Sequence, residues 1–235
     1  WDWPEEAGSA ILEVLTSEKA EKNDRLMAAE LAGDSVVVND ELASALLAIA
    51  QKANESPDLR SLAAISLGPA LEQADIALIE EDMEEALVSK KVFEKITTAL
   101  HELFLDANLP VKLRRRILEA SVRAPRDWHE DAIRDAYRRP DPDWKLTAVF
   151  CMQFIEGFEE EILESLNNPD LLIQEAAIDG AANWELEEAW PHIKKIIDKT
   201  GADKDLRLAA VAAAAFVNPK EAVEVLSKKI GRAHV

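Results

Sequence analysis

Small and apolar residues recur along this chain with the period of an α-helix, in consecutive segments separated by polar turns. The pattern is clearest over residues 58–70, where one side of a period of about 3.6 residues carries Leu59, Leu62, Ala63, Ser66, Leu67 and Ala70. This segment opens with an acid, one residue and a cation, Asp58-Leu59-Arg60, and then becomes rich in alanine. The pattern predicts a helix that packs a face of small residues against its neighbours.

The same opening returns along the chain, and its copies align on the cation position at Arg25, Arg60, Arg114, Lys145, Gln174 and Arg207. The intervals between these positions are 35, 54, 31, 29 and 33 residues, so all but one fit a single repeating unit. Two helical segments per unit at this spacing are typical of helical arrays, in which each unit contacts mainly its neighbours. The sequence therefore predicts about six helical hairpins in one domain over residues 1–235.

Capping residues and prolines predict where these helices begin and end. We expect Asn39 or Asp40 to begin the first helix of the second hairpin, and Asp58, Asp143 and Asp170 to cap second helices. Further helices are expected over residues 90–107, 144–155, 158–166, 170–182, 185–199, 205–217 and 219–230.

The long interval between Arg60 and Arg114 predicts an insertion at about residues 75–88. Its charged residues are all acids, which favours an extra short helix or an acidic loop. At the start of the chain, Trp1 and Trp3 are expected to fold back over the first hairpin, because the end of a repeat array needs a cover.

The turn-and-helix pattern resembles HEAT repeats, particularly the short bacterial kind first associated with phycobilin lyases. The best matches are Pro57-Asp58-Leu59-Arg60, Pro142-Asp143-Trp144-Lys145 and Asp205-Leu206-Arg207, each followed by alanines in the second helix. The resemblance covers residues 9–230 and implies an all-α fold, a right-handed α-α superhelix (an α-solenoid). It says less about function, because such arrays serve mostly as binding scaffolds.

Composition and charge narrow the classes of partner. Asp and Glu outnumber Lys and Arg by 46 to 27, which gives a net charge of −19 at pH 7. Such a charge repels phosphates and anionic lipids and attracts basic partners, so we expect no nucleic acid and no membrane as partner. A single cysteine, Cys151, excludes an internal disulfide and a cysteine-based zinc site. Without an uninterrupted apolar stretch of about 18 residues, the chain is expected to be cytoplasmic.

Two enzyme families with HEAT-like repeats offer catalytic comparisons. Deoxyhypusine hydroxylase binds two irons through His-Glu pairs just after the repeat cation, but here His101-Glu102 and His129-Glu130 fall on predicted first helices. Alkylpurine DNA glycosylases hold DNA in a basic groove, whereas residues 146–193 contain eleven acids and no Lys or Arg. We therefore expect no catalytic residue, no metal and no cofactor.

One stretch is locally basic. Residues 112–139 carry nine Lys or Arg residues against five acids. Acids in the turns of neighbouring repeats are expected to balance it. The alternatives are docking of an acidic partner, or pairing with the acidic insertion of a second copy.

The positions that face away from the packed stripe of each second helix are candidate partner contacts, because the resemblance implies that they line a concave surface. They include Arg115, Glu119, Leu146, Phe150, Gln153, Glu175, Asp179 and Leu208. An apolar face of this kind needs a cover, which the last helix of the chain, a tight superhelical curve or a partner could provide. The sequence thus favours a non-enzymatic protein-interaction scaffold for a protein or peptide with apolar anchors flanked by Lys or Arg. The alternative is a lyase-like HEAT-repeat enzyme or enzyme subunit.

Overall fold

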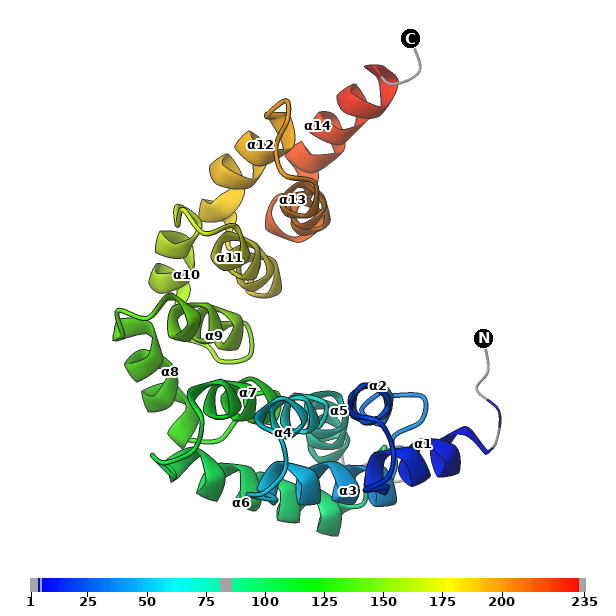
Figure 1. The fold of residues 1–235 in the computed structure, drawn as a ribbon. Helices are drawn as coiled ribbons and strands as arrows, with labels where there is room; N and C mark the ends of the chain where they lie inside the picture. The colour runs from blue at the N-terminus through cyan, green and yellow to red at the C-terminus, as the bar shows by residue number, and fades with distance from the viewer. Residues whose placement is uncertain (1–3, 5, 81–85, 233–235) are drawn as a thin grey trace. The chain divides into compact units, whose positions relative to one another are not determined.

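The computed structural model describes residues 4, 6–80 and 86–232, and within these ranges every regular element is a helix (Figure 1). The prediction of an all-α fold is therefore confirmed. The helices are α1 (Ala7–Thr16), α2 (Lys22–Leu31), α3 (Asp40–Gln51), α4 (Pro57–Ile65), α5 (Gly68–Ile79), α6 (Lys90–Leu105), α7 (Val111–Ser121), α8 (Trp128–Arg138), α9 (Pro142–Met152), α10 (Glu159–Ser165), α11 (Leu171–Asn183), the 3₁₀-helix η1 (Glu187–Ala189), α12 (Trp190–Asp198), α13 (Lys204–Val217) and α14 (Pro219–Arg232).

The chain divides into two compact units, unit 1 over residues 1–129 and unit 2 over residues 130–235. In unit 1 the first helices α1, α3 and α6 pack side by side, and so do the second helices α2, α4 and α7. Fully buried Leu15, Leu46, Ile96 and Leu100 fill the space between the two layers. In unit 2 the second helices α9, α11 and α13 are neighbours, with α10 against α9 and α11, and with α12 and α14 against α13.

The predicted helix over residues 58–70 is broken. α4 ends at Ile65, and α5 begins at Gly68 and packs against α6 and α7. Pro69 causes the break, because it has no N–H to bond the Ile65 carbonyl four residues earlier and its ring crowds that carbonyl. Residues 75–79 of the predicted insertion belong to α5, while 81–85, like Trp1 and Trp3, lie outside the described residues.

Prolines also move two helix caps. Ser56 rather than Asp58 caps α4, and Asp141 rather than Asp143 caps α9, so those two predictions are wrong. In both helices a proline occupies the first position, which its missing N–H suits, and the cap therefore lies one residue before it. Asp170 caps α11 as predicted, since no proline intervenes.

Among the described residues, one stretch, Pro57–Ile79, is long and apolar enough to span a membrane. It consists of α4 and α5, separated by the break at Ser66 and Leu67, and both helices contribute buried residues to the core of unit 1. The stretch is therefore built into the fold as two core helices.

The aligned repeat position, a cation in five copies and Gln174 in the other, is the fourth residue of its helix in all six. In unit 1 each arginine Nε donates to the backbone oxygen of the penultimate residue of the preceding helix, ten residues earlier. The distances are 3.2 Å from Arg25 to Leu15, 2.9 Å from Arg60 to Ala50 and 3.2 Å from Arg114 to Phe104. The arginines thus satisfy carbonyl groups that helix ends leave without partners.

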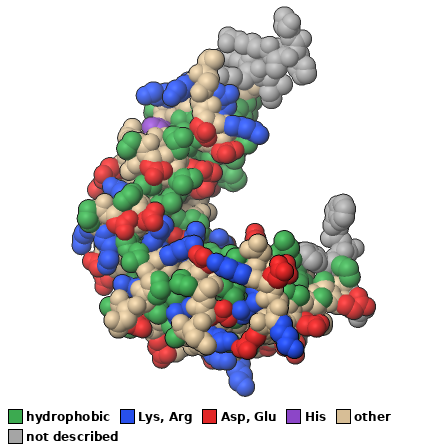
Figure 2. All heavy atoms as spheres, in the orientation of Figure 1, with side chains coloured by type: hydrophobic (Ala, Val, Ile, Leu, Met, Phe, Trp, Pro, Cys, Tyr) green, Lys and Arg blue, Asp and Glu red, His purple; other side chains and the backbone are tan. Residues whose placement is uncertain are grey.

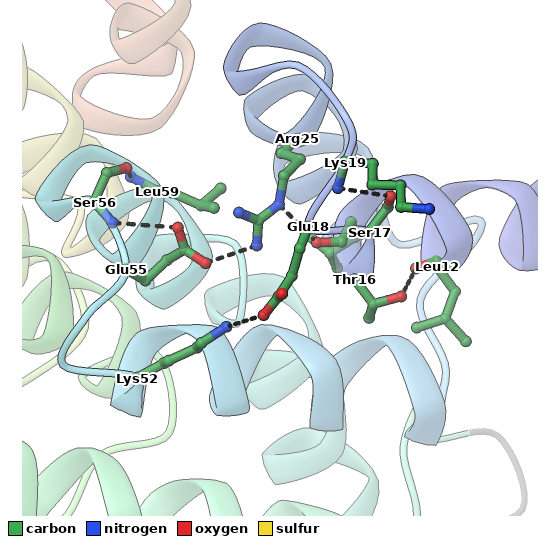
Figure 3. Close-up of polar contacts among 11 residues, drawn as sticks. Leu12, Thr16, Ser17, Glu18, Lys19, Arg25, Lys52, Glu55, Ser56 and Leu59 are labelled. Atoms are coloured by element: carbon green, nitrogen blue, oxygen red, sulfur yellow. Dashed lines mark hydrogen bonds and ion pairs between the residues drawn. The ribbon is translucent and has the colours of Figure 1, made fainter.

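Acids in the next turn complete this arrangement in the first repeat. Figure 3 shows Arg25 reaching Glu55, at 2.8 Å, in the turn before α4, while Lys52 pairs with Glu18 at 3.2 Å. The hydrogen bond from Arg25 lowers the pKa of Glu55. Arg25 therefore bonds a carbonyl at the end of α1 and a turn acid at the same time.

Candidate functional site

The second helices of unit 2 present a mixed apolar and acidic surface. Three large hydrophobic side chains remain more than half exposed there: Leu172 on α11 at 58%, Leu208 on α13 at 58% and Phe216 on α13 at 59%. Glu175 and Asp179 lie between them on α11, one turn apart. In Figure 2, hydrophobic and acidic side chains lie next to each other over this part of the chain.

A hollow of about 450 Å³ opens within this surface, between the C-terminal halves of α11 and α13. Its lining comprises Gln153, Asp179, Ala182, Asn183, Glu185, Ala212, Ala213 and Phe216. Two of these residues are acids and none is a cation, and one wall is formed by alanines and an aromatic ring. Hollows of this size with a few polar groups are typical of binding sites.

The surroundings of Asp179 change the pKa of its carboxyl group. Partial burial of its carboxyl raises the pKa of Asp179, and the negative charge of Glu175 raises it further. Both effects disfavour the ionised form, because one removes water and the other adds a like charge. A bound cation would reverse the second effect.

The rim of the hollow is fixed by contacts between the ends of α9 and α11. The Asn183 side chain donates to the Gln153 backbone oxygen at 2.6 Å, and the Trp184 indole donates to Met152 O at 2.9 Å. Glu185 follows with φ of +51°, the left-handed conformation that glycine or asparagine usually takes at a helix end. A non-glycine residue in this conformation is strained, and such strain often lies at functional sites.

The structure brings some of the predicted contact residues together and separates others. Gln153 and Asp179 line the hollow, and half-exposed Glu175 and exposed Leu208 lie on the same two helices, α11 and α13, as its lining. On α9, Leu146 and Phe150 are half-buried, and the Phe150 ring packs against Phe154 at 5.6 Å between centroids.

In unit 1, Arg115 is half-exposed, but Glu119 departs from the predicted outward position. Its side chain is only 5% exposed and pairs with Arg116 at 2.5 Å. The helical period alone misplaced it, because neighbouring helices cover that side of α7.

Asn183, Glu185 and Phe216 are among the lining residues that were not predicted from the sequence. The sequence did contain a sign of an exposed apolar residue such as Phe216, because α13 is apolar on almost all sides and a single packed face needs fewer apolar residues. It contained none for Asn183 and Glu185, since their roles depend on how the end of α11 meets the end of α9.

Unit 1 contains a second hollow, of about 460 Å³, with a different charge. It is lined by Leu26, Asp58, Ser61, Leu62, Ile65, Lys112 and Arg116. Asp58 bridges Lys22 at 3.2 Å and Lys112 at 3.0 Å, and hydrogen bonds from the two lysines lower the pKa of Asp58. Figure 2 shows Lys and Arg side chains over α7 and α4 with acids among them.

Acids inside the chain do pair with the basic stretch that contains Lys112, but the acids that pair lie on helices and not in the expected turns of neighbouring repeats. Arg123 pairs with Glu72 at 2.6 Å, and Arg126 pairs with Asp75 at 3.0 Å, both acids on α5. Arg134 pairs with Glu161 of α10 at 3.3 Å.

The two His-Glu pairs lie on first helices, α6 and α8, and among the described residues no group of three or more His, Cys, Asp or Glu is placed to hold a metal. The Trp128 ring stacks on His101 at 4.6 Å and on His129 at 3.7 Å. His129 is buried, with Nδ1 accepting from the Arg126 backbone N–H at 2.9 Å and Nε2 3.0 Å from the Ser121 hydroxyl.

Burial lowers the pKa of His129 from 6.5 to about 4, so protonation favours the unfolded chain. The unfolded chain binds this proton below pH 6.5 and the folded chain only near pH 4, so stability is lost as pH falls through that range. We expect the wild-type protein to lose up to about 3 kcal/mol more than His129→Gln between pH 7.5 and 4.5. Urea unfolding of both proteins at the two pH values measures the difference, and equal losses would contradict a buried neutral His129.

Comparison with known proteins gives one informative result. No protein-family model matches the chain, and its sequence matches no curated protein. Its fold is similar to a chain in the structure of the complex of CpcE and CpcF of phycocyanin lyase from Nostoc sp. PCC7120, with 18% sequence identity and a TM-score of 0.53. The similarity covers 97% of this chain and 95% of that chain. At this identity the likeness shows the fold, a HEAT-like helical array, and confirms the predicted α-solenoid class.

The similarity also corrects two expectations about function. The chain was expected to be a non-enzymatic scaffold and not an enzyme, yet the structure it resembles over nearly its whole length is part of a lyase. The finding favours the alternative, a lyase-like HEAT-repeat enzyme or enzyme subunit. The apolar repeat surface that suggested a scaffold does not separate the two classes, because a fold by itself does not determine function.

Proposed function

We propose that this chain is a subunit of a lyase-like enzyme that works together with a second protein chain. The observation that carries the proposal is the full-length similarity to one chain of a two-chain lyase complex. Since 95% of that chain is covered, the correspondence is with a whole subunit and not with a fragment of one.

The surface of unit 2 supplies the contact with the second chain in this proposal. Glu175 and Asp179 attract basic residues of that chain, while Phe150 and Leu208 pack against its apolar ones. Leu146 and Gln153 complete the contact residues inferred from the repeat pattern in unit 2. Half-exposed Arg115 remains a separate candidate contact on unit 1, whereas buried Glu119 does not. The chain belongs in this proposal to the short HEAT-repeat proteins and acts in the cytoplasm.

The proposal is tested with a tagged chain purified from its source cell. We expect a second protein in equal amount, and we expect the pair to change the covalent mass of phycocyanin or of another co-purified protein, as read by mass spectrometry. Each chain alone should leave those masses unchanged. A monomeric chain, or a complex that alters no protein's mass, would overturn the proposal.

A further inference from the structure

We infer that the hollow between α11 and α13 binds a cationic side chain of a protein partner, Lys or Arg, with a neighbouring apolar residue of the same segment seated on Phe216. The inference rests on the proposed function for the existence of a protein partner. It adds the place on this chain, the chemistry of the bound segment and the residues that select it.

The acids around the hollow pair with no Lys or Arg side chain that the structure describes. Among the described residues, Glu175, Asp179 and Glu185 make no ion pair, whereas Glu55, Asp58, Glu72 and Asp75 in unit 1 are each paired with Lys or Arg. The sequence supplies no Lys or Arg from Leu146 through Ile193, so no basic residue of α11 or its flanking turns can serve. Acids left unpaired beside an apolar wall are electrostatically complementary to a cation from outside.

The apolar part of the surface extends beyond the hollow, which favours a protein segment over a small cation. Phe216 lies in the lining, but Leu208 and Leu172 do not, and both are more than half exposed. Leu208 precedes Phe216 by two helical turns, about 12 Å along α13. A segment of about four extended residues covers that distance, so a chain with one cation and a flanking hydrophobic residue fits the whole surface.

The site is preorganised, which lowers the entropy lost on binding. The hydrogen bonds of Asn183 and Trp184 hold the end of α11 to the end of α9, and strained Glu185 turns the chain along the rim. Asp179, on α11 between these anchors and Glu175, is therefore presented by backbone that does not need to move.

The test uses the full chain and two synthetic peptides, acetyl-Leu-Arg-Lys-Phe-amide and its counterpart with Glu in place of Arg and Lys. Nuclear magnetic resonance follows the indole N–H of Trp184 and the backbone amides during titration. We expect the basic peptide to shift Trp184, Asp179 and Asn183 and the acidic peptide to shift none of them. Shifts confined to other residues, or equal shifts by both peptides, would overturn the inference.

Three variants separate the site from the rest of the surface. Asp179→Asn and Phe216→Ala should each raise the dissociation constant of the basic peptide at least threefold. The first substitution removes the negative charge, and the second removes the aromatic ring that contacts the apolar residue of the peptide. Glu160→Gln removes an exposed acid of α10 outside the hollow and should leave the affinity unchanged. If Glu160→Gln lowered the peptide affinity as much as Asp179→Asn, the net charge alone would attract the peptide, and the proposed site would be wrong.

A stability measurement distinguishes loss of binding from damage to the fold. Because burial and Glu175 both disfavour the ionised Asp179, Asp179→Asn should raise the melting temperature at pH 7 while weakening the peptide. A lower melting temperature would mean that Asp179 stabilises the free protein, against the inference. Peptide binding requires no reaction, so its failure is separate from a failure to find lyase activity. A dimer that dissociates as peptide is added would identify a second copy as the occupant and overturn the inference.

Discussion

Replacing Gly33 with alanine is expected to destabilise the protein by about 3 kcal/mol. Gly33 is buried just after α2 and faces the break between α4 and α5. An added Cβ would lie 2.7 Å from Ser66 Cβ and 2.8 Å from the Ser66 carbonyl carbon, with the carbonyl oxygen closer still. Since these are mostly backbone atoms, two helices would have to separate to admit the methyl group. Urea unfolding followed by circular dichroism measures the loss.

Gly8→Ala is the matched control. Gly8 lies within α1, where a Cβ would meet its nearest neighbours at 3.8 and 3.9 Å, ordinary contact distances. Alanine favours helix over glycine, so this variant should gain about 0.5–1 kcal/mol. If Gly33→Ala unfolds at the same urea concentration as Gly8→Ala, the result would contradict the close contact between Gly33 and Ser66.

Replacing Arg60 with alanine is expected to cost about 2–3 kcal/mol. The Arg60 side chain is buried, and its Nε donates to Ala50 O at 2.9 Å. The substitution leaves that carbonyl, at the end of α3, without a partner in a place that water does not reach, and it removes the packing of the aliphatic stem. Thermal and urea unfolding report the change.

Arg207 occupies the same repeat position on α13 and provides the comparison. It is half-exposed, and it reaches the Lys199 carbonyl through a terminal nitrogen at 2.8 Å. Water can replace this contact, so Arg207→Ala should cost less than about 1 kcal/mol. If Arg60→Ala and Arg207→Ala lowered the free energy of unfolding equally, burial would not determine how much the repeat arginine stabilises the protein.

The repeat pattern predicted most of the fold because the pattern and the packing have the same cause. A cation at the fourth position of a helix satisfies the carbonyl groups of the helix before it, so its spacing in the sequence measures the length of a hairpin. Gln174 occupies the repeat position without a charge, and its side chain donates to the Asn168 carbonyl in the turn before α11, not to a carbonyl at the end of α10. The two wrong caps, Asp58 and Asp143, came from reading the acid and not the proline beside it.

The candidate site was only partly accessible to such reasoning. Asp179 and Gln153 were found because a helical period separates outward from packed positions on a single helix. Glu119 was misplaced by the same rule, since the period cannot say how far a neighbouring helix extends over the outward side.

The sequence by itself determined the helical hairpins, the register of the repeat cation and the absence of Lys and Arg from residues 146–193, because each follows from local spacing or composition. Only the tertiary structure decided that Asp179, Glu185 and Phe216 line one hollow, that Asn183 and Trp184 fix its rim, and that Gly33 meets Ser66. These contacts join residues about 30 or more positions apart, or depend on how one helix ends. Their distances are set by the packing of whole helices, which no local pattern encodes.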